Sequence, residues 1–179
     1  PEVHFFMPNI PAEEVFTAPD YRRTEGAVRA TRPVTGLGDL VEGASFTFRE
    51  GEVVEASAER GEETLKRFLE MDEGSRFLGE VALVDSSSPV FRSGYLFYTT
   101  LLDENAACHI ALGNAYPGTI EGGAEMSPDE LKEAGANKSL QHTDFMIGSE
   151  EVDVVGVRRD GREVDLIRRG SFVLPERRE

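Results

Sequence analysis

Cysteine is nearly absent from this sequence, which has one cysteine and three histidines among 179 residues. Cys108 has no second cysteine to form a disulfide within the chain, and a thiolate zinc site needs more than one such ligand. A single thiol beside apolar residues is more typical of packing than of a nucleophile. Any metal ion must therefore be held by histidines and carboxylates.

Long apolar runs are also missing, because no stretch approaches the roughly 20 apolar residues of a membrane-spanning helix. The first residues, PEVHFFMPNIPAEE, lack the basic segment and small-residue cleavage site of a secretory signal. We therefore expect no membrane association and a cytoplasmic location. Because the sequence begins at Pro1 with a strand-like segment, we also expect that a preceding region has been removed.

Positive charge is scarce, with 19 lysines and arginines against 34 acidic residues and a net charge of -15. Proteins that bind nucleic acid need clustered basic residues to displace counterions, so we expect no nucleic-acid partner. The glycine-containing stretches GTIEGG and TGLGD lack the Gly-Lys-Ser/Thr of a phosphate loop. No G-x-S-x-G sequence occurs either, which argues against a serine hydrolase.

What remains is a pattern of strands near both ends with helices between them. The strands are expected at residues 3–7, 45–50, 52–59, 79–85, 139–148, 151–159 and 162–169, and the helices at 61–74, at 101–117 and after the capping sequence at 127–130. Residues 8–20 have the prolines of a loop. The pattern predicts a single α+β domain with a mixed, mostly antiparallel sheet and two or three helices.

The histidines are few enough for their neighbours to be informative. In HTDFM, the period of a strand places His142 and Asp144 on one face, and imidazole with carboxylate suits zinc, cobalt or manganese. An aspartate bonded to a neighbouring histidine in a half-buried strand explains the same motif. Glu80 lies at the edge of an apolar strand, where an unpaired carboxylate is costly to bury.

The segment LLDENAACHIALGNAYP is predicted to be a helix that begins at an Asp103 cap and ends at Pro117. At 100° per residue, His109 and Tyr116 would share one helical face. They could form part of a site. Alternatively, a backbone carbonyl satisfies the histidine, and the tyrosine ring is buried with its hydroxyl at the surface.

Four ordered segments carry a resemblance to a known family: PNIPAEEVFTAPDYRRTEGAVRAT, LGEVALVDSSSPV, FYTTLLDENAACHIALGNAYP and NKSLQHTDFMIGSEEVDVVG. Together they closely resemble the carboxyl-terminal half of the thermophilic metallo-aminopeptidases of the aminopeptidase T, S and II type. The resemblance covers essentially the whole chain. It implies that residues 1–179 are the metal-binding catalytic domain, that the family's amino-terminal domain is absent, and that the full-length protein is a homodimer.

The resemblance also implies two divalent metal ions (zinc, cobalt, manganese or magnesium) and hydrolysis of peptides with a free N-terminus by an activated water. The implied metal ligands are Glu14, Glu80, Glu104, His109, His142 and Asp144, with Glu13 as the alternative to Glu14. Glu80 would bridge the two ions, Glu80 or Glu104 would act as general base, and Tyr116 would stabilise the oxyanion. A non-catalytic metal-binding fragment and a mononuclear hydrolase are the alternatives.

Overall fold

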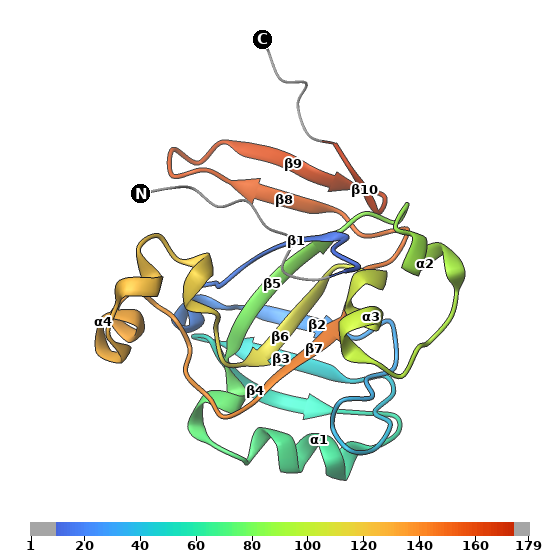
Figure 1. The fold of residues 1–179 in the computed structure, drawn as a ribbon, viewed down its shortest axis with the longest axis horizontal. Coiled ribbons are helices and arrows are strands. Elements are labelled where there is room, and N and C mark those ends of the chain that lie inside the picture. Colours follow the sequence, from blue (N-terminus) through green and yellow to red (C-terminus); the bar gives the residue numbers. More distant parts are fainter. Residues whose placement is uncertain (1–9, 174–179) are drawn as a thin grey trace.

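The computed structural model describes residues 10–173, so the strand expected at 3–7 lies outside the described residues. The strands are β1 (Glu14–Thr17), β2 (Gly26–Arg29), β3 (Ser45–Arg49), β4 (Glu52–Ser57), β5 (Leu78–Val84), β6 (His109–Gly113), β7 (His142–Met146), β8 (Val154–Val157), β9 (Glu163–Arg168) and β10 (Ser171–Phe172). The α-helices are α1 (Glu62–Leu69), α2 (Pro89–Ser93), α3 (Thr100–Asp103) and α4 (Pro128–Glu133). These elements confirm the predicted α+β class, although the described part of the chain contains three sheets and four short helices (Figure 1).

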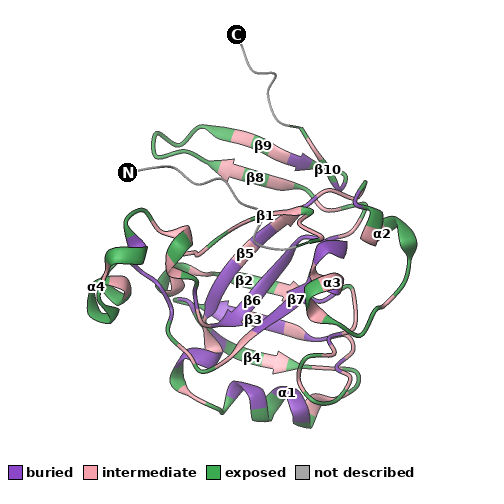
Figure 2. Cartoon of the chain, in the orientation of Figure 1, coloured by how far each residue is buried: buried purple, intermediate pink, exposed green. Residues whose placement is uncertain are grey.

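The central sheet has the strand order β1-β5-β6-β7, and each neighbouring pair is antiparallel. Its side chains alternate between two faces with different chemistry. On β7, Phe145 points into the apolar core, while His142 and Asp144 point to the opposite face, as the period of two predicts. Figure 2 shows that the buried residues concentrate along β5, β6 and β7.

The apolar face of the central sheet packs against the second sheet, β2-β3-β4, and against α1. Phe145 lies at their junction: its ring centroid is 4.8 Å from that of Phe46 on β3 and 6.3 Å from that of Phe68 on α1. The predicted hairpin of β3 and β4 is confirmed. Glu50 and Gly51 both have positive φ in its turn, and a Cβ on Gly51 would collide with the carbonyl oxygen of Tyr21, so only glycine fits there.

The third sheet, β10-β9-β8, lies beyond the β1 edge of the central sheet (Figure 1). It contains the predicted carboxyl-terminal hairpin, with Gly161 at positive φ in the turn. The capping sequence at 127–130 is also confirmed, since Ser127 and Glu130 form a reciprocal capping box at the start of α4. No helix within residues 10–173 is long and apolar enough to cross a membrane.

The helix predicted at residues 101–117 is wrong. α3 ends at Asp103, a single 3-10 turn follows, and the chain then enters β6. All five residues of β6 are buried between β5 and β7. A strand covered on both faces lacks alternation, so its short apolar run cannot be distinguished from a buried helix by periodicity. The Asp103 side chain makes no capping hydrogen bond to the turn that follows it: its buried carboxylate accepts the N–H groups of Phe97 at 2.7 Å and Thr99 at 3.1 Å.

The start of the chain and the end of α1 also differ from the prediction. The segment expected to be a loop at residues 8–20 contains β1, whose four residues pair with β5. Prolines lie on both sides of this strand and limit its length. The same prolines led to the prediction of a loop. The helix predicted to end at Gly74 ends at Leu69, and a separate 3-10 turn, Glu73–Arg76, follows it.

Candidate metal centre

The register of the central sheet places five acidic and histidine side chains on one face. Across β5 and β6, Ala82 pairs with His109, and across β6 and β7, Ala111 pairs with Asp144. Because directly paired residues of antiparallel strands share a face, the four strands bring the polar groups together. The residues on this face are Glu14 of β1, Glu80 of β5, His109 of β6, and His142 and Asp144 of β7.

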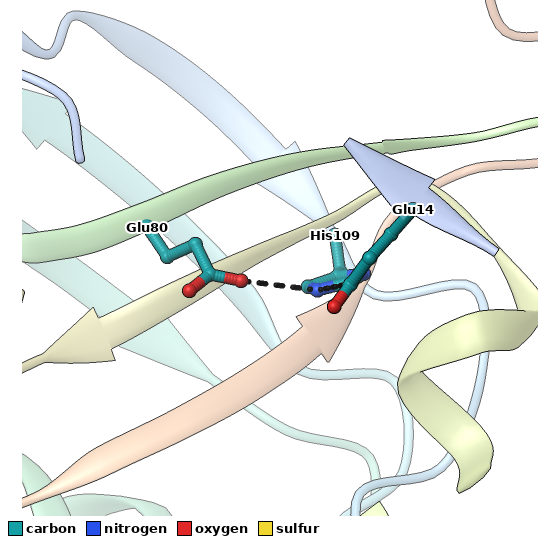
Figure 3. A group of neighbouring side chains, drawn as sticks. All are labelled: Glu14, Glu80 and His109. Carbon is teal, nitrogen blue, oxygen red and sulfur yellow. Dashed lines mark ion pairs between the residues drawn. The ribbon is translucent and has the colours of Figure 1, made fainter. Parts of the chain in front are cut away.

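Glu80 lies between the two histidines. Its Oε1 is 3.4 Å from Nε2 of His109, and its Oε2 is 3.8 Å from Nε2 of His142. Two groups of possible ligand atoms result: one from Glu14, Glu80 and His109, and one from Glu80, His142 and Asp144. Within each group, all of the atoms lie within 4.8 Å of one another. Figure 3 shows how the side chains of the first group converge.

Three atoms of this cluster are buried without a hydrogen-bond partner: Oε2 of Glu14, Nε2 of His109 and Oδ1 of Asp144. Buried polar atoms are costly when nothing satisfies them. Nε2 of His109 is nevertheless only 3.1 Å from Oε2 of Glu14 and 4.0 Å from Oδ1 of Asp144. All three atoms therefore face one small region, where a cation would satisfy them together.

Backbone carbonyls fix the orientation of both histidine rings. Nδ1 of His109 lies 3.0 Å from the carbonyl oxygen of Ala107, and Nδ1 of His142 lies 2.7 Å from that of Asn114. A carbonyl can only accept, so each Nδ1 carries its proton and each Nε2 faces the carboxylates, free to hold either a second proton or a metal ion. The donor set of imidazoles and carboxylates fits a borderline divalent metal.

The carboxylates also favour positive charge at the histidines. Burial alone would lower the pKa of His142, but the Asp144 carboxylate, 3.4 Å from its Nε2, outweighs burial and raises that pKa to about 9. For His109, burial is likewise outweighed, by the neighbouring carboxylates of Glu14, Glu80 and Asp144, and its pKa lies well above the usual value. Electrostatically, the cluster requires cations, whether protons or metal ions.

Glu104 and Tyr116 line the same cleft, which has a volume of about 780 Å³, but neither belongs to the two groups of ligand atoms. Burial, together with the charges of Asp144 and Glu14, raises the pKa of Glu104 to about 7. The Tyr116 ring centroid is 4.7 Å from that of His142, and 48% of the residue is exposed. The predicted proximity of His109 and Tyr116 to one site is found, but they come from β6 and the loop after it rather than from one helical face.

The sequence interpretation placed no function on Phe16, Leu101 or Thr119, which form a less polar part of the cleft lining. Phe16 could have been identified from Glu14, because residues two apart in a strand share a face. Because residues 8–20 were predicted to be a loop, the period of a strand was not applied to them. Of the two candidate glutamates, Glu14 faces the cluster with 8% of its side chain exposed, whereas Glu13 is exposed.

This arrangement can be compared with known proteins. Residues 1–172 match the family described as thermophilic metalloprotease (M29). The chain belongs to the M29 family. It is 52% identical over 169 residues to aminopeptidase 2 of Geobacillus stearothermophilus, a match that covers 94% of this chain and 41% of the relative. It is 53% identical over 167 residues to aminopeptidase T of Thermus aquaticus, covering 93% and 40%.

A solved structure agrees with the M29 assignment. Wild-type AmpT from Thermus thermophilus is similar with a TM-score of 0.87 and 52% identity, over 93% of this chain and 41% of that chain. The chain therefore spans about two fifths of the length of these relatives. Membership in a metalloprotease family implies a divalent metal cofactor, which agrees with the three unsatisfied buried atoms of the cluster.

Proposed function

We propose that residues 1–179 form the metal-binding catalytic domain of an aminopeptidase, which hydrolyses the first peptide bond of peptides with a free N-terminus. The observation that carries this proposal is the position of Glu80, whose two oxygens face different histidines. A carboxylate in that position can serve two ions at once. Glu14, Glu80 and His109 would hold one ion, and Glu80, His142 and Asp144 the other.

Two divalent ions, when bound, would supply Lewis acidity and lower the pKa of the water molecule that attacks the peptide bond. The ion identity we propose is zinc, cobalt, manganese or magnesium, as the donor set allows. The chain's own residues would then handle the protons and the substrate. Glu104 lies in the cleft, half-buried, without belonging to either ligand group, so its carboxylate is available to accept a proton. We therefore assign the general-base role to Glu104 rather than to Glu80.

Tyr116 lies on the open side of the cleft, beside His142. From there its hydroxyl can donate a hydrogen bond to the carbonyl oxygen of the scissile bond as negative charge develops on it. The carboxylate-rich cleft would favour a positively charged group, such as the α-ammonium group of a peptide. The less polar wall of Phe16 and Leu101 would face the side chain of the first substrate residue.

Metal stoichiometry tests the proposal. The purified chain should bind two equivalents of zinc or cobalt, measured by elemental analysis after removal of free metal. One equivalent would favour the mononuclear hydrolase, and none would favour a non-catalytic fragment. Homodimerisation of the longer protein and a cytoplasmic location, which the family resemblance implies, stay predictions.

A further inference from the structure

Asn105 lies beside the metal centre without contributing a ligand atom to it. The residue is fully buried, in the 3-10 turn (Glu104–Ala106) that connects α3 to β6. Its Oδ1 accepts the backbone N–H of Glu13 at 2.7 Å, and its Nδ2 donates to the carbonyl oxygen of Leu101 at 2.9 Å. Its own carbonyl oxygen accepts the hydroxyl of Ser88 at 2.7 Å. The Asn105 side chain thus joins the start of β1 to the turn of α3.

The bond to Glu13 acts at a sensitive point of the chain. β1 has four residues and is the edge strand of the central sheet, so only β5 pairs with it there. Along such a strand, a shift of one residue would exchange the faces of Glu13 and Glu14. The far end of β1 is held by a different bond, from the Ala18 N–H to Oγ1 of Thr119 at 3.1 Å. Asn105 supplies the corresponding anchor at the end where Glu14 lies.

We propose that Asn105 is a positioning residue that holds the Glu14 carboxylate in place for the ion shared with Glu80 and His109. This inference rests on the proposed function, because it assumes a metal ion at that group. It predicts a selective effect: loss of the Asn105 side chain should lower the affinity for the ion held by Glu14. The affinity for the other ion, held by His142 and Asp144, should stay nearly unchanged. A role limited to folding would lower stability without selecting between the ions.

The experiment is a set of zinc titrations by calorimetry, with affinity as the readout rather than activity. Asn105→Ala should weaken one of the two ions by about 10- to 100-fold, the loss typical when a partner behind a metal ligand is removed. In a Glu14→Gln background, the same substitution should change the affinity by less than about threefold, because the group through which it acts is already altered. In a His142→Ala background, the full loss should persist for the ion that remains.

Asn137 provides a matched control. It is also a nearly buried asparagine, and its Nδ2 donates to the carbonyl oxygens of Gly74, Phe77 and Gly113, away from β1. Asn137→Ala should lower the melting temperature without selectively weakening the ion that depends on Glu14. A selective loss at that ion in both variants would mean that the effect is a general consequence of destabilisation and would overturn the inference.

A second variant covers the case in which Asn105→Ala does not fold. Glu13→Pro removes the N–H that Asn105 Oδ1 accepts but leaves the bond from Asn105 to Leu101 in place. Proline is tolerated at the start of an edge strand, so this variant should weaken binding of the ion held by Glu14 by about tenfold or more. A folded Glu13→Pro chain with wild-type affinity for both ions would contradict the inference, as would equal weakening of the binding of both ions by Asn105→Ala. A wild-type chain that binds no zinc would instead contradict the proposed function, and the inference with it.

Discussion

Glu80 and His109 face each other from neighbouring strands, with Oε1 of the carboxylate 3.4 Å from Nε2 of the ring. The second oxygen of Glu80 lies 3.8 Å from Nε2 of His142 on the far side of the cluster. One side chain therefore belongs to both groups of possible ligand atoms, while every other member belongs to one. This asymmetry distinguishes Glu80 experimentally from the carboxylates around it.

Glu80→Gln should lower the affinity for both metal ions, whereas Glu14→Gln should lower the affinity for only one. Removal of a residue that only hydrogen-bonds a metal ligand typically lowers metal affinity by about 10- to 100-fold. Because each of these substitutions replaces a ligand oxygen itself, the loss of affinity should be at least as large. Zinc titration with elemental analysis measures both affinities. Glu13→Gln is the matched control, since Glu13 is adjacent to Glu14 but exposed. A Glu80→Gln chain that kept one ion at wild-type affinity would show that the carboxylate is not shared.

The metal-free chain should become less stable as pH rises from about 4.5 to about 9. Burial and the neighbouring carboxylates raise the pKa of Glu104 to about 7, and Asp144 raises the pKa of His142 to about 9 against the opposing effect of burial. The unfolded groups titrate near 4.5 and 6.5. The folded chain thus binds more protons between these values, and its free energy of unfolding falls with pH. The contribution of Glu104 is lost between pH 4.5 and about 7, and that of His142 between pH 6.5 and about 9.

Thermal unfolding in the presence of a chelator, followed by circular dichroism, measures this dependence. Zinc should oppose it, because loss of the proton from Nε2 of His142 allows that nitrogen to bind metal, and binding stabilises the folded state. The double variant Glu104→Gln, His142→Gln should show a shallower fall in melting temperature than the wild type. Equal slopes in the two chains would mean that the pH dependence arises elsewhere.

Prediction from sequence succeeded where the pattern was local. The alternation in HTDFM placed His142 and Asp144 on one face, and the strand of Glu80 was identified from its apolar run. It failed where burial removed the pattern: HIALG is covered on both sides, so it lacks the period of a strand and was assigned to a helix. The convergence of Glu14 with His109 was supplied by family resemblance, because no local pattern encodes contacts between distant strands.

Tyr116→Phe should reduce catalysis while leaving metal content unchanged. The phenyl ring can keep its place beside His142, but the donor to the substrate carbonyl is lost, at a cost on the order of a hundredfold in kcat. A chimera in which this chain replaces the matching part of Thermus thermophilus AmpT provides the assay, with an aminoacyl reporter as substrate. Tyr95→Phe is the control, because Tyr95 is exposed and lies outside the cleft lining. If Tyr116→Phe kept full kcat, the hydroxyl would have no part in the reaction.

The chain alone should retain its metal ions yet cleave reporters more slowly than the same chimera. All five residues of the two ligand groups lie within the described residues, so we expect the chain alone to bind metal. The cleft, however, is open beside them: Tyr116 is 48% exposed and Leu101 43% exposed. Since the chain spans about 41% of AmpT, the remaining part of that protein is available to cover this opening and to orient the peptide. Misplacement by about 1 Å can cost on the order of a hundredfold in rate, so kcat/KM at equal metal occupancy should differ by at least that factor. Equal values for the two proteins would mean that residues 1–179 are sufficient for catalysis and that the exposed side of the cleft needs no cover.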